Sequence, residues 1–524
     1  MTRILLLALT IGLAGLSAPR AAAETVLRVT PHADLRVLDP HTNTATITTM
    51  HAHLIYDTLF ALDETLVPRP QMVETETVSS DRLVYDFVLR PGLRFHDGQP
   101  VTSRDVVPSL KRWMVRDGFG QQLAAFMAEL IALDDRRFEI RLKEPFPFVE
   151  MALASSSGMV PVIMRAKDAA TDPFQMVTET VGSGPFRFVR AEWVPGVKVV
   201  YEKNPDYLPR TEPPNGLAGG KVVKVDRMEW IVLPDPMTKT SALQKGEIDI
   251  IDQVPLDQVP LLANVPGVTI GRVNPVDNTG IIRPNHLVPP FDNPKARQAL
   301  ALMGDQREYM HAAYGDDSKW WRECWSFFIC GTSNETEAGA ESLRARNLAR
   351  AKALLAESGY KGEPLVLLTT REIPTIGALG DVTAANLQAI GATVEVRESD
   401  WGTMLARRAK KDPPANGGWN LFNTNLTSGT MFNPLTNFAI GETCGGKSWF
   451  GWPCDVEADA LERAYVRAPD AAAQRAALEA LHRRLWQVVP FVPVGQYAQP
   501  LAWRNNVTGL LTATVNVYWN IEKH

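Results

Sequence analysis

The stretch RMEWIVLPDPMTKTSALQKGEIDIIDQVP, residues 227–255, predicts a strand, a loop, a helix and a second short strand. The helix is expected over Met237–Lys245, and the half-turn Gly246-Glu247 separates it from a buried strand over Ile248–Ile251. Strands that alternate with helices in this way are typical of an α/β chain. The predicted fold class is therefore α/β.

The N-terminal half contains a further strand and helix. The segment VYDFVL, residues 84–89, alternates in the way of a half-buried strand. Thr102 is followed three residues later by Asp105, a spacing that resembles a capping box and predicts a helix over Val106–Trp113. This half therefore has the same α/β character as residues 227–255.

The organisation starts again at about residue 278. Residues 291–303 have the spacing of an amphipathic helix, and a long C-terminal helix places Leu478, Leu481 and Leu485 on one face. The sequence contains no fixed-period repeat and no low-complexity linker. A chain of 524 residues is expected to form two or more domains. We therefore expect two α/β lobes without a flexible joint.

The stretch VGSGPFRF, residues 181–188, has two glycines around a serine and could belong to three kinds of site. A phosphate loop needs G-x-x-x-x-G-K-[ST], and a nucleophile turn needs G-x-S-x-G before a helix. Here Pro185 follows the second glycine and a strand pattern begins at Phe186. We expect a corner before a strand, in which the glycines supply unusual φ angles. The sequence contains no catalytic signature, so an enzyme is not expected.

The first 23 residues have the pattern of a cleaved signal peptide. A cation at position 3 precedes an apolar run, and Ala21-Ala22-Ala23 is typical of a cleavage site before Glu24. No cysteine follows the run, so no lipid anchor is expected. The sequence thus predicts a Sec-exported, soluble protein.

The charge balance is slightly acidic, with 54 Lys and Arg against 59 Asp and Glu and a net charge of −5. Loss of the leader removes two arginines and makes the mature chain more negative. This balance argues against nucleic acid and against an anionic membrane surface as partners.

Four cysteines, Cys324, Cys330, Cys444 and Cys454, are expected to form two disulfides in an oxidising compartment. Of the three possible connectivities we favour the local one, Cys324–Cys330 and Cys444–Cys454. A zinc site is the alternative, but the usual C-x₂₋₄-C spacing and nearby histidines are missing. The nine histidines form no metal-binding motif. We expect neither a metal nor a cofactor.

Tryptophans and asparagines concentrate late in the chain. The stretch GGWNLFNTNLTSGTMFNPLTNF, residues 417–438, combines amides and hydroxyls with large rings. This composition suits an enclosed polar ligand, and a polar surface loop with aromatic core anchors is the alternative. The candidate ligand-binding residues here are Trp401, Trp419, Asn423, Asn425, Thr427 and Ser428.

Seven motifs follow one another along nearly the whole mature chain. They are LDPHTNT (38–44), YDFVLRPGLRFHDGQPVTSRDVVPSLKR (85–112), GSGPFRFVRAEWVPGVKVVYEKNPDYLP (182–209), LQKGEIDI (243–250), PPFDNPKARQALALMGDQRE (289–308), ARAKALLAESGY (349–360) and VTGLLTATVNVYWN (507–520). With these motifs the chain resembles the extracellular solute-binding proteins of family 5, the periplasmic components of peptide and nickel ABC importers.

The resemblance implies a two-lobe periplasmic binding protein fold with an extra subdomain in lobe one and a ligand cleft between the lobes. The expected divisions are 1–23 for the cleaved signal peptide, 24–277 for lobe I with the inserted subdomain at about 60–180, 278–497 for lobe II, and 498–524 for a C-terminal return to lobe I.

The resemblance also implies ligand-binding residues. Trp401 resembles the pocket-lining tryptophan of the family. Arg371, in LTTREIPT, lies where dipeptide binders hold the ligand carboxylate, and a solvated loop cation is the alternative. Thr44, Asn278 and Thr279 lie in segments that line the cleft in the family.

One departure from the family bears on the ligand. Peptide binders carry an aspartate near the position of Ser428, where it pairs with the α-ammonium of the peptide. Here no acid lies between Asn420 and Glu442. A buried ammonium without a counter-charge is strongly disfavoured, so an ordinary free-amine peptide is in doubt.

The implied function is that of a periplasmic receptor that captures a peptide or peptide-like solute and delivers it to an inner-membrane ABC permease, as a monomer. The missing acid keeps opines, other modified amino acids and small glycans open as ligands. A nickel or other metal chelate is less favoured, because the histidines do not cluster. The alternatives outside this class are a chaperone-like protein with an open apolar groove and a hydrolase that turns over a substrate.

Overall fold

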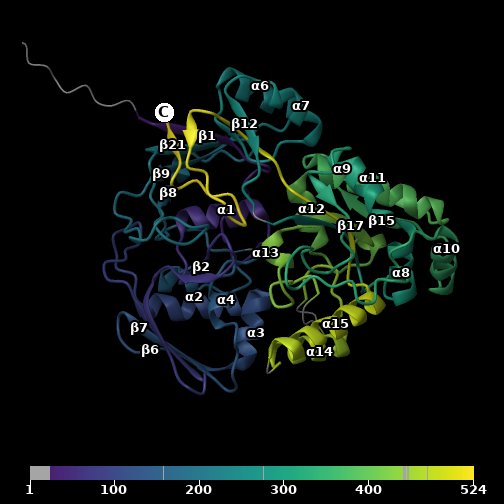
Figure 1. Cartoon of the computed structure of the whole chain (residues 1–524), viewed down its shortest axis with the longest axis horizontal. Helices are drawn as coiled ribbons and strands as arrows, with labels where there is room; N and C mark the ends of the chain where they lie inside the picture. Colours follow the sequence, from purple (N-terminus) through teal and green to yellow (C-terminus); the bar gives the residue numbers. More distant parts are fainter. Residues whose placement is uncertain (1–23, 157, 275, 441–443, 445–447, 469) are drawn as a thin grey trace, which may run out of the picture.

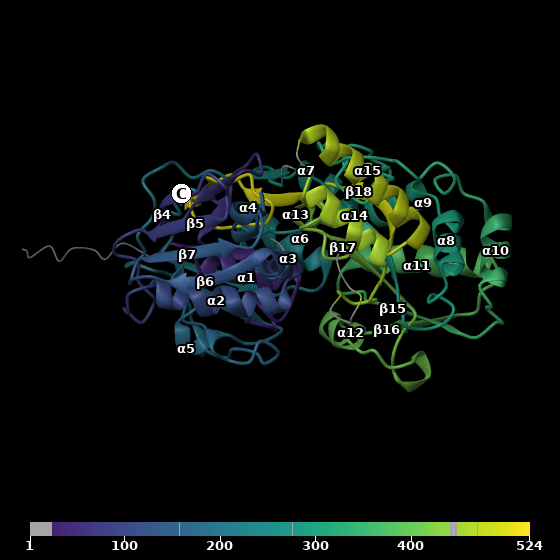
Figure 2. The same cartoon turned by 90° about the horizontal axis from the view of Figure 1, so that it is seen from below.

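The computed structural model describes residues 24–524 apart from 157, 275, 441–443, 445–447 and 469. The expected signal peptide, residues 1–23, lies outside the described residues. Two large sheets form the centres of two lobes that lie side by side (Figures 1 and 2). We call the lobe with the seven-stranded sheet lobe one and the lobe with the six-stranded sheet lobe two. The expected α/β class is confirmed.

The sheet of lobe one has the strand order β12-β19-β11-β1-β10-β9-β8. Strand β1 pairs in parallel with β10 and β11, and the other pairs are antiparallel. The strands are β1 (Val26–Thr30), β8 (Phe186–Phe188), β9 (Lys198–Lys203), β10 (Arg227–Ile231), β11 (Ile250–Ile251), β12 (Val268–Gly271) and β19 (Leu501–Arg504). The helices of this lobe are α1 (Thr46–Ile55), α6 (Pro236–Lys245) and α7 (Val259–Ala263).

Residues 227–255 form β10, α6 and β11 in the predicted order. Helix α6 starts one residue earlier than predicted, where the Asp235 carboxylate caps it, and ends at Gly246 with a left-handed φ of 77°. Strand β11 is two residues shorter than predicted. Just before this strand, the Asp249 carboxylate accepts the Arg28 N–H at 2.8 Å.

The sheet of lobe two has the strand order β14-β18-β13-β17-β15-β16. Its strands are β13 (Asn278–Pro284), β14 (Trp321–Arg322), β15 (Leu365–Thr369), β16 (Val394–Glu398), β17 (Leu421–Leu426) and β18 (Val492–Tyr497). Its helices are α8 (Pro294–Met303), α9 (Gln306–Tyr314), α10 (Leu348–Glu357), α11 (Pro374–Ala389), α12 (Trp401–Arg408), α13 (Ser428–Met431), α14 (Val456–Val466) and α15 (Ala471–Val488). The predicted face of α15, with Leu478, Leu481 and Leu485, is buried.

A four-stranded antiparallel sheet, β4-β5-β7-β6, lies beside lobe one with helices packed around it (Figure 1). Its elements are β4 (Val73–Val78), β5 (Val84–Leu89), α2 (Ser103–Arg116), α3 (Gly118–Phe126), β6 (Met127–Ala132), β7 (Arg137–Leu142), α4 (Val149–Leu153) and α5 (Ala166–Ala169). Thr102 and Asp105 form the predicted capping box, and α2 extends beyond the predicted range at both ends. Two small sheets pair β2 (Phe60–Leu62) with β3 (Pro68–Pro70), and β20 (Val507–Thr508) with β21 (Glu522–Lys523).

The Gly-Ser-Gly corner before β8 packs against the C-terminal end of α1. Neither Gly182 nor Gly184 has a positive φ, so the expectation of unusual φ angles is wrong. A Cβ atom on Gly182 would lie 1.7 Å from the carbonyl oxygen of Ile55, and one on Gly184 would lie 2.7 Å from that of Leu54. The glycines are needed because two backbone segments approach closely here.

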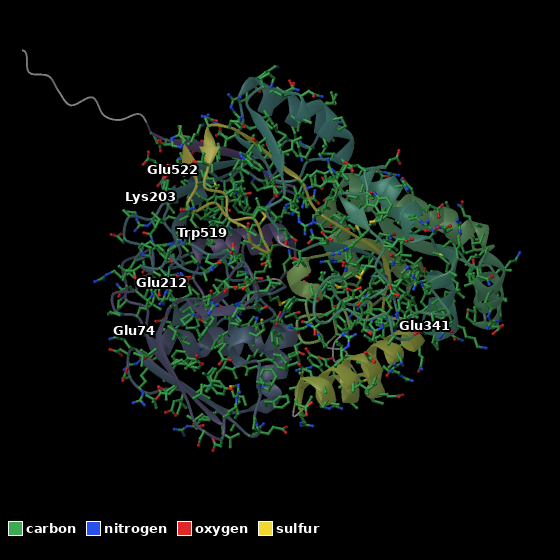
Figure 3. The ribbon with its side chains drawn as sticks, in the orientation of Figure 1. Glu74, Lys203, Glu212, Glu341, Trp519 and Glu522 are labelled. Atoms are coloured by element: carbon green, nitrogen blue, oxygen red, sulfur yellow. A yellow bond between two sulfur atoms is a disulfide. The ribbon has the colours of Figure 1, made fainter. Side chains whose placement is uncertain are left out.

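The chain passes between the two large sheets twice, once between β12 and β13 and again between β18 and β19. The residues after β19 then pack into lobe one. Trp519 lies there (Figure 3) and is fully buried. The Nζ of Lys221 lies 5.0 Å from its ring centre. Lys221 also pairs with Asp57 at 2.7 Å. The C-terminal segment is therefore part of the core of lobe one.

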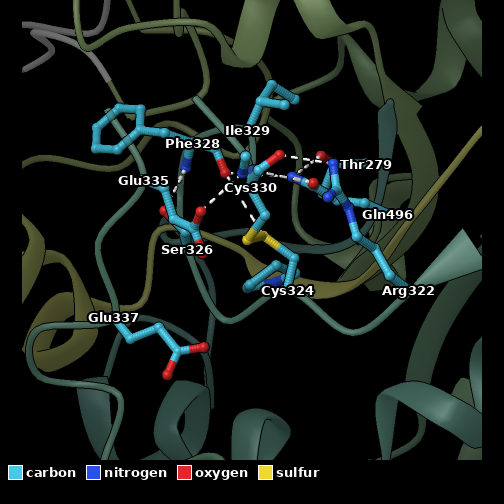
Figure 4. The surroundings of a disulfide bond; sticks show 12 residues. Thr279, Arg322, Cys324, Ser326, Phe328, Ile329, Cys330, Glu335, Glu337 and Gln496 are labelled. Carbon is cyan, nitrogen blue, oxygen red and sulfur yellow. Dashed lines mark hydrogen bonds between the residues drawn. A yellow bond between two sulfur atoms is a disulfide. The ribbon is translucent and has the colours of Figure 1, made fainter. Parts of the chain in front are cut away.

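Both disulfides have the local pairing that the sequence favoured. Cys324 is bonded to Cys330, and Cys444 to Cys454. The first pair is buried in lobe two, where the Cys330 N–H donates to Gln496 Oε1 at 3.1 Å (Figure 4). The cysteines therefore serve to crosslink the chain locally.

Replacing Cys324 and Cys330 together by serine is expected to lower the free energy of unfolding by about 2 kcal/mol. The bond closes a short loop with a sequence separation of 6, and its loss gives the unfolded chain more conformational freedom. Urea unfolding followed by tryptophan fluorescence measures the change. The same double replacement at Cys444 and Cys454 is the matched comparison. An unchanged unfolding midpoint in the first variant would contradict the prediction.

Candidate ligand-binding site

Two adjoining pockets lie where the lobes face each other. The first contains about 560 Å³ of empty space and the second about 810 Å³, open solvent included. Thr46, Trp401, Thr514, Val515 and residues 424–427 line both pockets, which therefore form one cleft. Its walls come from α1 and the C-terminal segment in lobe one, and from β17 and α12 in lobe two.

Each pocket also has residues of its own. The first is further lined by Thr44, Ala45, Thr49, Ser156, Gly158, Arg408, Thr430, Phe438 and Trp449. The second is further lined by His32, Met50, Asp252, Gln253, Asn274, Asn278, Ile373, Ile376, Tyr497, Gln499, Leu501 and Asn516. Polar and aromatic side chains thus surround the cleft on both sides.

The end of β17 supplies a polar wall. Strand β17 pairs with β13 and β15 inside the sheet of lobe two, which fixes its position. Thr427 then caps α13, because its Oγ1 accepts the Thr430 N–H at 3.4 Å. Asn425 lines both pockets, and its Oδ1 is buried without a hydrogen-bond donor among the described residues. A ligand N–H or O–H at this oxygen would remove the cost of an unpaired buried acceptor.

Helix α12 presents an aromatic ring and a cation to the cleft. Asp400 starts the helix by accepting the Thr403 N–H at 3.0 Å. Trp401 and Arg408 lie about two turns apart and so on the same side of the helix. Both line the first pocket.

The Arg408 guanidinium is buried among aromatic rings, with an exposed fraction of only 4 %. Its Cζ lies 4.7 Å from the ring centre of Phe450, 5.5 Å from Trp449, and 5.9 Å from both Trp401 and Phe422. Burial lowers its pKa to about 9, so the group remains charged at neutral pH. Within the described part of the chain no carboxylate pairs with it, and its Nε has no acceptor.

A buried carboxylate lines the second pocket. Asp252 Oδ2 accepts the backbone N–H of His32 at 3.2 Å and lies 2.8 Å from His32 Nδ1. Its other oxygen accepts a hydrogen bond from Asn516 Nδ2. Unlike Arg408, this charged group has hydrogen-bond partners within its own lobe. The cleft therefore combines an acid on lobe one that has hydrogen-bond partners with a cation on lobe two that pairs with no described acid.

Five of the ten predicted ligand-binding residues line this cleft. Thr44 lines the first pocket, Asn278 lines the second, and Trp401, Asn425 and Thr427 line both. The other five do not line either pocket.

The guanidinium of Arg371 is already occupied. Its Nη atoms donate to both oxygens of Asp381 at 2.7 and 2.9 Å, and its Nε donates to Glu398 at 3.0 Å. These two carboxylates raise its pKa, and half of the side chain is exposed at the surface of lobe two. Arg371 thus pairs with acids of its own lobe, and its role in holding a ligand carboxylate stays a prediction.

The remaining four residues form the framework behind the cleft. Trp419 is fully buried, and its Nε1 donates to the Arg408 carbonyl at 3.1 Å. Asn423 donates to a carbonyl of β13, and Ser428 Oγ lies 3.2 Å from the Asn274 amide. Thr279 accepts a hydrogen bond from Gln496, beside the buried disulfide (Figure 4). Their polar groups thus bind the protein itself, and their contacts with a ligand stay predictions.

Three further residues of the cleft, Arg408, Asp252 and His32, were not predicted from the sequence. Arg408 belongs to the cationic run RRAKK, residues 407–411, in which no local pattern distinguishes it from its neighbours. Asp252 and His32 lie far apart in the sequence and meet only through the pairing of β1 with β11. The position of Arg408 two helical turns after Trp401 was the one available signal.

The described residues contain no group of three or more His, Cys, Asp or Glu side chains that could hold a metal ion. His51 and His53, on α1, are buried, and burial lowers the pKa of each to about 3. In the same part of the chain, no helix is long and apolar enough to cross a membrane.

The chain is similar to known proteins along most of its length. The family model for bacterial extracellular solute-binding proteins, family 5 Middle, matches residues 67–445. The probable peptide ABC transporter periplasmic-binding protein y4tO of Sinorhizobium fredii is 38% identical over 506 residues, which cover 96% of this chain and 94% of that protein.

Two solved structures share the fold. The structure of AgaA from A. tumefaciens R10 in complex with agropinic acid has a TM-score of 0.80 at 22% identity, and covers 95% of this chain and 99% of that chain. The structure of a dipeptide binding protein from Pseudoalteromonas sp. SM9913 in complex with Met-Leu has a TM-score of 0.78 at 19% identity, and covers 95% of this chain and 100% of that chain.

Proposed function

Since this chain belongs to family 5 of the bacterial extracellular solute-binding proteins, we propose that it captures a peptide or peptide-like solute between its lobes and delivers it to an inner-membrane ABC permease. The resemblance found in the sequence motifs is thereby confirmed. This family provides the substrate-binding component of transporters and is not a family of enzymes. The similarity to y4tO, a probable peptide-binding protein, supports a peptide as the solute.

The observation that carries the proposal is a cleft lined from both lobes. A solute that touches both lobes is bound best when the lobes are closed, so binding shifts the equilibrium between open and closed forms. A permease that contacts both lobes is then able to distinguish the loaded receptor from the empty one. This coupling is what import requires of a binding protein.

We propose the lobe boundaries 277/278 and 497/498, which are supported by the two changes of sheet. The four-stranded sheet between residues 73 and 142 supports an inserted subdomain at about 60–180. The receptor acts in the periplasm as a monomer after removal of residues 1–23. The periplasmic name of the relative y4tO supports this location.

A modified amino acid such as an opine is the second candidate solute. The observation that favours it is the neutral end of β17, where no acid lies between Asn420 and Glu442 to pair with a free α-ammonium. A solute whose amine is blocked or substituted does not need that acid.

Native mass spectrometry of mature protein purified without refolding tests the proposal. We expect a bound small molecule whose mass separates a peptide from an opine or a sugar. If the protein is empty, calorimetric titration with peptides and opines follows. Turnover of a substrate would support a hydrolase instead. Protein that binds unfolded chains but no small molecule in a saturable way would support a chaperone-like role.

Replacing Arg36 by glutamine is expected to weaken solute affinity by about two- to fivefold. Arg36 of lobe one pairs with Asp400 of lobe two at 2.9 Å, so its loss disfavours the closed form. Because both side chains are partly exposed, the effect should shrink at high salt. Titration calorimetry with the identified solute measures it. The control is Arg28→Gln, which removes a pair with Glu229 inside lobe one. An equal loss in both variants would contradict the prediction.

A further inference from the structure

Arg408 differs from the other buried arginines of the described chain. Arg112 and Arg165 donate to carboxylates, and Arg283 and Arg297 donate to backbone carbonyls. Arg408 is also buried, with an exposed fraction of 4 %, yet its guanidinium donates no hydrogen bond to a described residue, and its Nε is enclosed without an acceptor. Among the residues that the structure describes, its environment therefore lacks a hydrogen-bond acceptor with negative charge.

This arrangement is unfavourable for the empty protein. A buried cation without a counter-charge loses its hydration and gains little in return. The four surrounding rings attract the guanidinium through their faces, which recovers only a part of that loss. A ligand that brings the acceptor into the first pocket would account for the retained charge.

The opposite wall of the same pocket is also suited to an anion. Helix α1 begins there, and Thr44, Ala45, Thr46 and Thr49 line the pocket. Ala45 is the N-cap residue, no side chain caps the helix, and its first turn contains no acid. The first N–H groups of a helix and its dipole attract negative charge. Lobe one thus offers hydrogen-bond donors opposite the cation of lobe two.

We infer that the solute carries a carboxylate that binds in the first pocket, between the Arg408 guanidinium and the N-terminus of α1. This inference rests on the proposed function and adds the charge of the solute and the residue that recognises it. A guanidinium binds a carboxylate through two parallel N–H bonds, which fixes its orientation. Because the two donors belong to different lobes, the carboxylate also links closure to the presence of the solute.

The first test measures the stability of the empty protein. We expect Arg408→Met to raise the apparent Tm by about 1–2 °C, because it removes an unpaired buried charge and keeps most of the volume. The matched control is Arg283→Met. Arg283 is equally buried, but carbonyls of Ala439 and Pro490 accept its N–H groups, so its loss should lower the apparent Tm. A decrease in both variants would overturn the inference, because Arg408 would then serve the fold.

The second test measures binding by titration calorimetry. The probes are Met-Leu, N-acetyl-Met-Leu and the C-terminal amide of each, together with any solute released from the purified protein. Arg408→Met should weaken binding of a free carboxylate more than 30-fold, and Arg408→Lys should weaken it less. The amides should bind weakly to the wild-type protein, and their affinity should change little in the variants. The inference would be overturned if a free carboxylate and its amide bound equally well. It would also be overturned if Arg408→Met bound the free carboxylate with unchanged affinity.

A different result would contradict the proposed function. If the wild-type protein carries no solute and binds neither these probes nor the peptides and opines of the calorimetric titration, the receptor proposal is contradicted. The comparison of Arg408→Met with Arg283→Met still decides whether Arg408 serves the fold, because it needs no ligand.

Discussion

Replacing Trp401 by alanine is expected to weaken solute affinity by about 100-fold. Trp401 is the first residue of α12, and its side chain lines both pockets of the cleft. Its ring also lies 5.9 Å from the Arg408 Cζ, where it helps to exclude water from the cation. The substitution removes a large aromatic surface at the centre of the site. Titration calorimetry with the solute found by mass spectrometry measures the loss.

Trp321→Ala is the matched control for Trp401. Trp321 lies in β14 of the same lobe, is only partly buried and does not line either pocket. Its Nε1 donates to the Gly315 carbonyl at 2.8 Å. We expect solute affinity to stay within about twofold of wild type in this variant. Comparable losses in the two variants would mean that Trp401 acts through stability and not through contact with the solute.

Replacing Gly182 by alanine is expected to lower the free energy of unfolding by about 3 kcal/mol or more. The added Cβ would lie 1.7 Å from the Ile55 carbonyl oxygen, far inside van der Waals contact. Backbone lies on both sides of this contact, so no side chain is able to move aside. The displaced segment also carries the Gly184 N–H, which donates to the same carbonyl at 2.9 Å. Urea unfolding and soluble yield report the effect.

Gly118→Ala provides the control for this effect. Its φ is not positive, and the new Cβ would lie 3.7 Å from the nearest atom, an ordinary contact with Phe438. We expect a change within about 0.5 kcal/mol at this position. If Gly182→Ala were tolerated equally well, the close approach of the corner to α1 would not explain the glycine.

Local signals in the sequence were sufficient to predict the elements of the fold. The capping box of Thr102 and Asp105 and the face formed by Leu478, Leu481 and Leu485 depend on neighbours a few residues away. The strand over residues 84–89 and the local disulfide pairing are also confirmed, and both depend on residues that are close in the sequence. The reason predicted for the glycines of the Gly-Ser-Gly corner, unusual φ angles, was wrong. The glycines are needed because the Ile55 carbonyl, from a distant segment, approaches Gly182 closely.

The site was only partly accessible from the sequence. Asn425 and Thr427 line the cleft because they end a strand whose neighbours fix its position. Trp419 belongs to the same polar and aromatic stretch as Asn425 and Thr427, but its ring is buried in the core. Composition identifies a stretch that is rich in binding groups, and it does not say which of them face the cleft.

Arg371 and Arg408 differ in the groups that folding places around them. The sequence by itself determined the α/β class, the family and the existence of a polar site near the end of β17, because these depend on local periodicity and on motifs. Only the tertiary structure decided which groups surround each cation. Arg371 is neutralised by Asp381 and Glu398, whereas Arg408 is enclosed by rings and has no described acid beside it. The availability of a charge depends on the groups that folding brings around it, and those groups are distant in the sequence.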